Sequence, residues 1–466
     1  MQNISVESSG FDRPASDPRT IRFLKAPITA TLLRLAAPNI LVMMMQSSVG
    51  LIETYFIAKL GVSMLAGLSL VFPILMLMQM TAAGAIGGGI LTAVARALGR
   101  GGHQEAGNLV WYAVAVAIVL GLLSSAIVVL AGKPLYASMG GRAATLQAAL
   151  VYSNVIFGGA VLVWLFNALA AVIRGTGDMI LPASVICGGA IFLVPLSPAL
   201  IFGWGPLPRL GITGGAIAVL IYYGAGSAIF AFHLWSGRGV LRPPRTPSKL
   251  SWQPVREILR VGGVSSIITA TTNLTIATIT GFAGTYGIAA LAGYGAGARL
   301  EYLLVPLVFG IGTPIGAMVG TCCGAGDTRR ALRVAWTGAL VAFILTETIG
   351  LAAACFPSVW LGYFGSDPAM LAAGSIYLRS VGPFYGFFGM GNALFFAAQG
   401  SGRLKWPFVA SLSRTGLALS CGWLAQHYTS SIHGIFIAAS LGMVAFGGIN
   451  AAATWRQSTA EQRARQ

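Results

Sequence analysis

Two glutamates stand inside long apolar stretches, where a charged side chain is unfavourable. Glu53 lies in the apolar stretch 29–57, and Glu301 lies well inside the stretch 288–322. An ionisable side chain in a membrane-spanning segment costs at least a few kcal/mol, so we take its presence as a sign of function. A carboxyl group kept away from water can bind and release a proton as its surroundings change. We therefore predict that Glu53 and Glu301 couple an ion, with a proton favoured and sodium as the alternative.

Each glutamate also has a structural interpretation that the sequence leaves open. Glu53 can instead reach water at the outer interface, or Lys59. Glu301 can instead form a buried ion pair with Arg379 or Arg414 from another helix. The sequence does not choose between these roles.

Neutral amides inside the apolar stretches provide hydrogen-bonding groups for a small organic ligand. With few acids beside them, they favour a monocation, a zwitterion or a neutral amphiphile over a dication. The predicted substrate-binding residues are Gln46, Asn154, Asn167, Asn273 and Asn392.

The sequence has no clear motif for metal binding, nucleotide binding or catalysis. The five cysteines form no CxxC pair and lie near no histidine cluster, so we predict no metal site. The glycine run 87–89 and the run 324–326 are not followed by Lys-Ser/Thr, so they favour helix packing over phosphate binding. We predict no catalytic residues and no cofactor. An integral-membrane enzyme remains an improbable alternative, because the four histidines are scattered.

The composition places the chain in a lipid bilayer. Of 466 residues, 56% are hydrophobic and 9% are charged, and the mean hydropathy is +0.78. The apolar residues form blocks of the length that a membrane-spanning helix needs. These blocks predict an all-α membrane protein with twelve transmembrane helices, at 29–57, 64–95, 107–131, 146–173, 179–203, 212–236, 254–284, 288–322, 331–355, 369–398, 406–426 and 432–454.

The basic residues predict the orientation of the chain. Despite the net charge of +17, they lie between the apolar blocks rather than along one face, so they do not indicate nucleic-acid binding. Most fall in alternate loops, which the positive-inside rule assigns to the cytoplasm together with both termini. We expect a bacterial inner-membrane protein that contacts lipid and is a monomer. Its predicted parts are a disordered cytoplasmic tail (1–28), a first lobe (29–236), a linker (237–253), a second lobe (254–455) and a C-terminal tail (456–466).

The two halves repeat each other. Gly61-Val-Ser-Met-Leu-Ala-Gly aligns with Gly287-Ile-Ala-Ala-Leu-Ala-Gly, and Arg174-Gly-Thr-Gly aligns with Gln399-Gly-Ser-Gly. Each half has an even number of spans, so the copies share one topology about an axis along the membrane normal. Parallel repeats of this kind are typical of transporters whose halves rock around a binding site between them.

These motifs, in this order, resemble the multidrug and toxic compound extrusion (MATE) family, in its bacterial NorM/DinF-like branch. The resemblance runs from about Leu32 to Trp455 and rests on Leu35-Ala-Ala-Pro38, Glu53-Thr54, Arg174-Gly-Thr-Gly-Asp178 and Gly324-Ala-Gly-Asp. It implies two six-helix lobes in a V, alternating access, and ion-driven export of organic cations and drugs. A flippase for a lipid-linked precursor is the alternative within transport.

The resemblance also bears on the coupling ion. Where the family's fifth helix carries cation-coordinating side chains, this chain has Leu193 and Ser197. A sodium site needs several oxygen ligands with compensating negative charge. The departure favours proton coupling.

Overall fold

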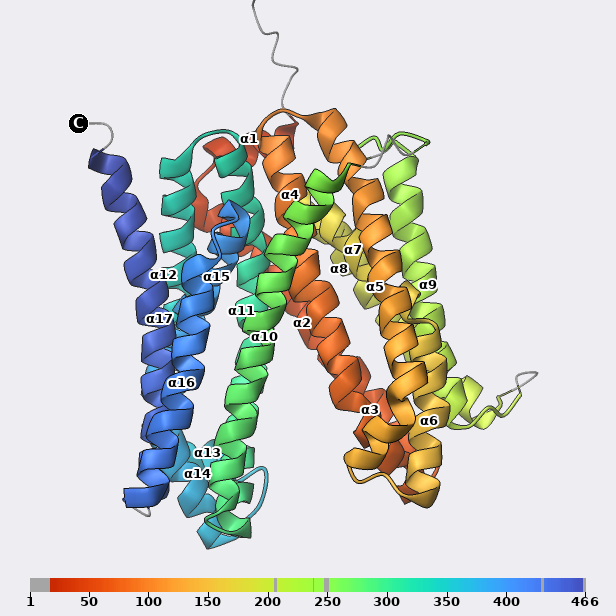
Figure 1. Cartoon of the computed structure of the whole chain (residues 1–466), viewed down its shortest axis with the longest axis vertical. Coiled ribbons are helices and arrows are strands. Elements are labelled where there is room, and N and C mark those ends of the chain that lie inside the picture. Colours follow the sequence, from red (N-terminus) through yellow and green to blue (C-terminus); the bar gives the residue numbers. More distant parts are fainter. Residues whose placement is uncertain (1–16, 205–207, 238, 247–250, 429–430, 464–466) are drawn as a thin grey trace, which may run out of the picture.

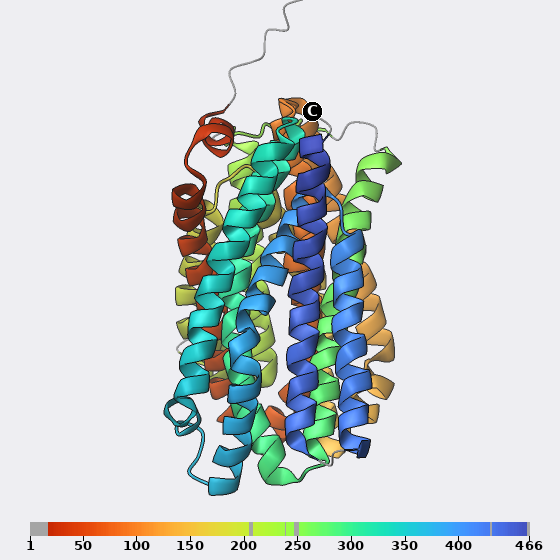
Figure 2. The same ribbon diagram turned by 90° about the vertical axis from the view of Figure 1, so that its left-hand side faces the viewer.

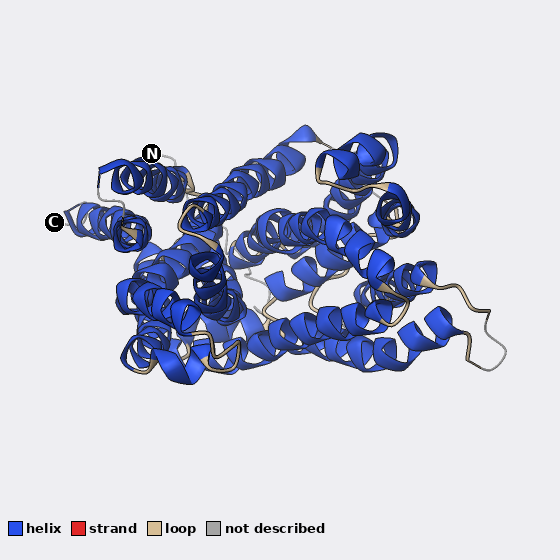
Figure 3. Ribbon diagram, turned by 90° about the horizontal axis from the view of Figure 1, so that it is seen from below, coloured by secondary structure: helices blue, strands red, loops and turns tan. Residues whose placement is uncertain are grey.

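The computed structural model describes residues 17–204, 208–237, 239–246, 251–428 and 431–463. Every regular element in this part of the chain is a helix, as Figure 3 shows in a view from below. The first half contains α1 (Pro18–Lys25), α2 (Ile28–Ala58), α3 (Val62–Met80), η1 (Thr81–Ile86), α4 (Gly87–Gly99), α5 (His103–Ser138), α6 (Ala143–Gly158), α7 (Ala160–Gly175), α8 (Ile180–Phe202) and α9 (Ile212–Trp235).

The second half has its own series of helices. It contains α10 (Trp252–Gly284), α11 (Ile288–Gly324), α12 (Thr328–Cys355), α13 (Pro357–Leu361), α14 (Pro368–Val381), η2 (Gly382–Phe384), α15 (Tyr385–Ser401), α16 (Lys405–Tyr428) and α17 (Ile432–Arg463).

Each of the twelve predicted spans coincides with a helix or with a run of consecutive helices. Nine are single helices, and three are composite: α3–η1–α4, α6–α7 and α14–η2–α15. Among the described residues, eight helices are long and apolar enough to cross a membrane by themselves, or nine if the pair α6–α7, bent by 47°, counts as one. The fold is therefore the expected all-helical, multi-span bundle.

The composite spans α6–α7 and α14–η2–α15 break at corresponding points of the repeat. Gly159 separates α6 from α7, and the turn η2 around Pro383 separates α14 from α15. Glycine and proline are the usual causes of a sharp bend inside a helix. The fourth and tenth spans are therefore both interrupted, and the fourth is bent by 47° at its break.

Two lobes, α2–α9 and α10–α17, meet at one end of the bundle and diverge toward the other (Figure 1). We call the end that carries both described chain ends the terminal end. There α4 and α11 touch backbone to backbone: a Cβ on Gly99 would collide with the carbonyl of Thr321, and one on Gly324 with the carbonyl of Arg96. The two contacts are related by the internal repeat, because the same offset joins Gly99 to Gly324 and Arg96 to Thr321. Only glycine permits so close an approach.

The prediction of a disordered N-terminal tail is wrong for residues 18–25. They form α1, whose first turn is capped by the Asp17 carboxylate. The helix is held by both lobes: Arg19 pairs with Asp178 at 3.0 Å, and Arg330 donates to the carbonyl of Phe23 at 2.7 Å. A hydropathy pattern cannot reveal such a helix, because its stability comes from these tertiary contacts. At the other end of the chain, α17 continues to Arg463.

Candidate functional site

Glu53 belongs to α2 and contacts residues of α6 and α9 in the first lobe. The hydroxyl group of Tyr152, itself 1% exposed, donates a hydrogen bond of 2.9 Å to its Oε1 atom. On α9, a Cβ on Gly215 would stand 3.4 Å from the same oxygen, so the absence of a side chain leaves room for the carboxylate. No ion pair joins Glu53 to a basic residue in the described part of the chain. Lys59, the partner considered above, lies over the ring of Tyr55 at 4.6 Å instead.

Glu301 on α11 has a different environment in the second lobe. Its Oε1 atom pairs with Nη2 of Arg414 at 3.1 Å, and the two side chains are 12% and 4% exposed. Tyr377 donates to its Oε2 atom at 3.3 Å. The guanidinium group of Arg414 also faces the ring of Phe388 at 5.4 Å. Of the two partners considered from the sequence, Arg414 is the one in contact, and Arg379 is exposed.

The two tyrosines occupy corresponding positions of the repeat. The offset that places Arg174 on Gln399 also places Tyr152 on Tyr377. Each tyrosine binds a carboxylate, but Glu53 comes from the first span of its lobe and Glu301 from the second. The tyrosine donor therefore has the same position in both halves, whereas the glutamate that accepts its hydrogen bond lies in a different span in each half. One lobe holds a carboxylate without an ion pair, and the other holds a neutralised pair.

The predicted amides do not form one cluster. Asn167 and Asn392 correspond in the repeat, and each donates at 2.9 Å to the carbonyl four residues earlier. Asn273 does the same on α10, and both Asn273 and Asn154 are exposed. The side chain of Gln46 lies outside the described part of the structure. Among the described side chains, no hydrogen bond joins any two of these amides.

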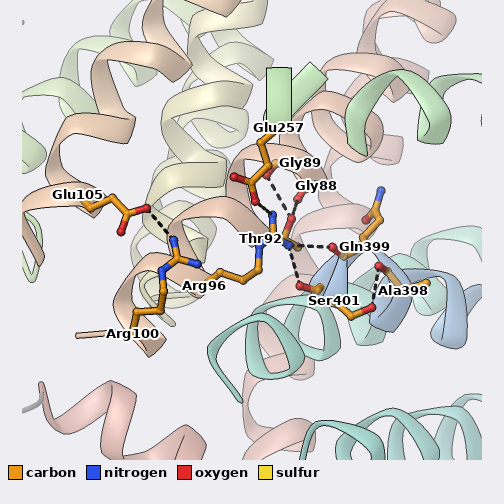
Figure 4. A network of polar contacts seen from close by, with 11 residues as sticks. Gly88, Gly89, Thr92, Arg96, Arg100, Glu105, Glu257, Ala398, Gln399 and Ser401 are labelled. Atoms are coloured by element: carbon orange, nitrogen blue, oxygen red, sulfur yellow. Dashed lines mark hydrogen bonds and ion pairs between the residues drawn. The ribbon is translucent and has the colours of Figure 1, made fainter. Parts of the chain in front are cut away.

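A polar network joins the lobes at the terminal end (Figure 4). Arg96 of α4, which is 8% exposed, donates to the carbonyl of Gly400 at 2.8 Å and pairs with Glu257 of α10 at 2.8 Å. Gln399 donates to Ser265 at 2.8 Å and, across the boundary, to the carbonyl of Gly84 at 3.2 Å. Arginine at the C-terminal carbonyls of a helix is favourable by charge and by hydrogen bonding. This network holds the two lobes together at the terminal end.

Sequence reasoning missed Tyr152, Tyr377 and the network of Arg96 with Gln399. Aligning the halves could have found the tyrosines, since both stand at one offset from the Gly-x-Gly motifs. Arg96 offered no such signal, because its counterpart in the repeat is Thr321 and its partners come from the other lobe.

The comparisons with known proteins agree with this architecture. The MatE family model matches residues 38–199 and 265–424. A protein of Shewanella oneidensis named "FAD transporter" is 26% identical over 89% of this chain and 92% of its own length. "Probable multidrug resistance protein NorM" of Thermotoga maritima is 26% identical over 82% of each chain. A solved structure titled "Outward-facing conformation of a multidrug resistance MATE family transporter of the MOP superfamily" superposes with a TM-score of 0.86 at 20% identity, covering 95% of this chain and 99% of that one.

Proposed function

Because the chain belongs to the MATE family of multi-pass membrane efflux transporters, we propose that it exports small organic compounds in exchange for protons bound at Glu53. The observation that carries the proposal is the Glu53 carboxylate, which holds one tyrosine hydrogen bond and no ion pair in the described part of the chain. Such a group can gain or lose a proton without first breaking a salt bridge. A fixed ion pair would oppose that exchange.

Glu301 is the second coupling residue of the proposal. Arg414 pairs with it, and Tyr377 donates a hydrogen bond to it. Its part in the coupling would therefore require the pair with Arg414 to separate. This gives the lobes different roles in one cycle: Glu53 exchanges the proton directly, and Glu301 responds to rearrangement of the second lobe.

Sodium coupling is the alternative. Leu193 is 3% exposed and Ser197 is 3% exposed on α8, and the Ser197 hydroxyl has no hydrogen-bond partner among the described residues. Neither position supplies a carboxylate or an amide oxygen, so neither adds the negative charge that compensates a bound cation. This supports proton coupling.

The cargo we propose is a monocation, a zwitterion or a neutral amphiphile, bound between the lobes by amides that include Asn167 and Asn392. The few acids support this choice over a dication. The relative named "FAD transporter" makes an anionic dinucleotide the competing cargo. The terminal end is proposed to be cytoplasmic, because the lysines and arginines of the loops gather there.

Transport by the purified protein in liposomes tests the proposal. Efflux of ethidium, a fluorescent monocation, is followed under a proton gradient or a sodium gradient for the wild type, Glu53→Gln and Glu301→Gln. The control is Glu105→Gln, which alters an exposed acid paired with Arg100 on the same lobe. We expect proton-driven efflux that Glu53→Gln abolishes and Glu105→Gln leaves intact.

Three outcomes would contradict parts of the proposal. Proton-driven efflux by Glu53→Gln at the wild-type rate removes Glu53 from the mechanism. Activation by sodium alone overturns the coupling ion. Movement of FAD without movement of ethidium overturns the class of cargo and leaves the transporter assignment in place.

A further inference from the structure

A cavity of about 290 Å³ opens into the second lobe at the terminal end. Helices α11, α12, α15, α16 and α17 form its wall, and α16 and α17 lie side by side along it (Figure 2). The volume is near the lower limit of small-molecule sites. The lining includes neither Glu53 nor Glu301.

The wall of the cavity is amphipathic. Its apolar part includes the buried side chains of Ala335, Leu394 and Ala397. Its polar part includes the buried Asn450 and the partly exposed Ser401, Thr454 and Gln457. A cavity that has both an apolar wall and partly exposed polar groups fits an amphiphile whose head group lies at those polar groups.

Two arginines line the cavity, and one of them carries a charge that no acid balances in the described part of the chain. Arg403 is exposed and forms no ion pair in the described part of the chain. Arg96 enters from the first lobe, donates to the carbonyl of Gly400 and pairs with Glu257 at 2.8 Å, so its charge is balanced. Glu461 stands one turn beyond Gln457, and neither it nor Glu257 is part of the lining. The lining itself therefore attracts anions.

Tryptophans place this cavity at the level of the lipid head groups. Trp406 belongs to its wall and is 38% exposed. Trp455 of α17 is 64% exposed and packs edge-on against Trp336 of α12. Exposed tryptophans of membrane proteins concentrate at the interface between lipid and water. Basic sites between helices at this level are suited to acidic lipid head groups.

We propose that this cavity binds an amphiphilic anion, with its phosphate or carboxylate at Arg403 and its apolar part against Leu394 and Ala335. A phospholipid and a free amphiphilic phosphate share this chemistry. The site goes beyond the proposed function and does not depend on Glu53.

The site links the ligand to the conformation of the transporter. Arg96 belongs to the first lobe, so the lining is complete only while the lobes are closed at the terminal end. A ligand that binds one conformation more tightly shifts the population toward it. The bound anion is therefore expected to hold the terminal end closed.

Cys323 supplies a native reporter, because it is half-buried and forms part of the cavity wall. The full-length protein is placed in phosphatidylcholine nanodiscs, with or without phosphatidylglycerol, and alternatively with octyl phosphate in solution. Alkylation of Cys323 by N-ethylmaleimide is then quantified by peptide mass spectrometry. Cys355, which is exposed and outside the cavity, is the internal control.

We expect an anionic probe to slow alkylation of Cys323 at least threefold and to leave Cys355 unchanged. Arg403→Gln should remove this protection, and Ala398→Phe should remove it by filling the cavity. Glu461→Gln should strengthen the protection. Arg329→Gln, which alters an exposed arginine outside the lining, should retain it.

The probes separate the two sources of the anion. Protection by phosphatidylglycerol alone identifies a lipid site, and protection by octyl phosphate alone identifies a site for soluble anions; either supports the proposal. Equal protection in Arg403→Gln and the wild type overturns it, as does an unprotected wild type. Failure of maleimide to react with Cys323 without a probe also overturns it, because the cavity would then be closed to ligands. If Ala398→Phe does not fold, Arg403→Gln still decides the result.

Discussion

The hydroxyl group of Tyr152 donates a hydrogen bond of 2.9 Å to the carboxylate of Glu53. The residues lie in different spans of the first lobe and are 99 positions apart in the sequence, so the contact forms only through the tertiary structure. A hydrogen bond to a charged group contributes roughly 1.5–3 kcal/mol. The contact therefore holds the carboxylate of Glu53 in one orientation.

Replacing Tyr152 with phenylalanine tests this contact. Loss of the hydrogen bond leaves the carboxylate without its orienting donor, and we expect proton-driven ethidium efflux to fall about tenfold. The same efflux assay measures it. Tyr302→Phe is the control, since Tyr302 is 55% exposed. Wild-type efflux by Tyr152→Phe would show that the hydrogen bond does not serve transport.

Removing only one partner of the ion pair between Glu301 and Arg414 is expected to lower the stability of the protein. Arg414→Leu leaves the Glu301 carboxylate buried with only Tyr377, which should destabilise the protein by about 3–5 kcal/mol. The double variant Glu301→Gln/Arg414→Leu should recover most of that loss. Thermal unfolding in detergent measures both. Additive effects of the two substitutions would mean that the residues do not interact.

Arg96→Ala should loosen the closure of the lobes at the terminal end. It removes the hydrogen bond to Gly400 and the ion pair with Glu257, both of which cross the boundary. Electron–electron distance measurements between spin labels on the two lobes should show a larger population open at that end. Arg100→Ala is the matched control, because Arg100 pairs with Glu105 within one lobe and both are about half exposed. Identical distance distributions for Arg96→Ala and the wild type would exclude this role.

The close contact between α4 and α11 makes Gly324 intolerant of a side chain. A Cβ there would collide with the carbonyl of Arg96, so Gly324→Ala must push the lobes apart or lower stability by about 1–3 kcal/mol. Gly263→Ala on α10 is the control, since a Cβ there has no neighbour within 4 Å. Thermal unfolding of the two variants gives the comparison. A neutral Gly324→Ala would mean that the lobes are not held this closely.

The helix α1 is expected to strengthen the same closure. Phe23 is 2% exposed, packs against Gly177 of the first lobe, and accepts through its carbonyl from Arg330 of the second. Phe23→Ala should release α1 and increase proteolysis of the N-terminal segment several-fold. Ile21→Ala, at a 39% exposed position of the same helix, should not. Equal proteolysis of the two variants would contradict the role of α1 in joining the lobes.

The sequence by itself determined the membrane setting, the twelve spans and their duplication. A chain segment in lipid must satisfy its own backbone hydrogen bonds, so a long apolar block is expected to form a helix. The helix α2 begins and ends within one residue of the predicted span 29–57. The sequence also singled out Glu53 and Glu301, because a carboxyl group inside such a block is recognisable without any structure.

Only the tertiary structure decided which side chains meet. The sequence offered Arg379 and Arg414 equally as partners of Glu301, and packing of α11 against its neighbours selected Arg414. It gave no reason to join Arg96 to Gly400, since that contact depends on how two lobes are placed around the close approach at Gly324. Burial in lipid depends on each segment alone, so the composition of a segment predicts it. Pairing between segments depends on helix rotation and crossing, which the apolar pattern leaves free.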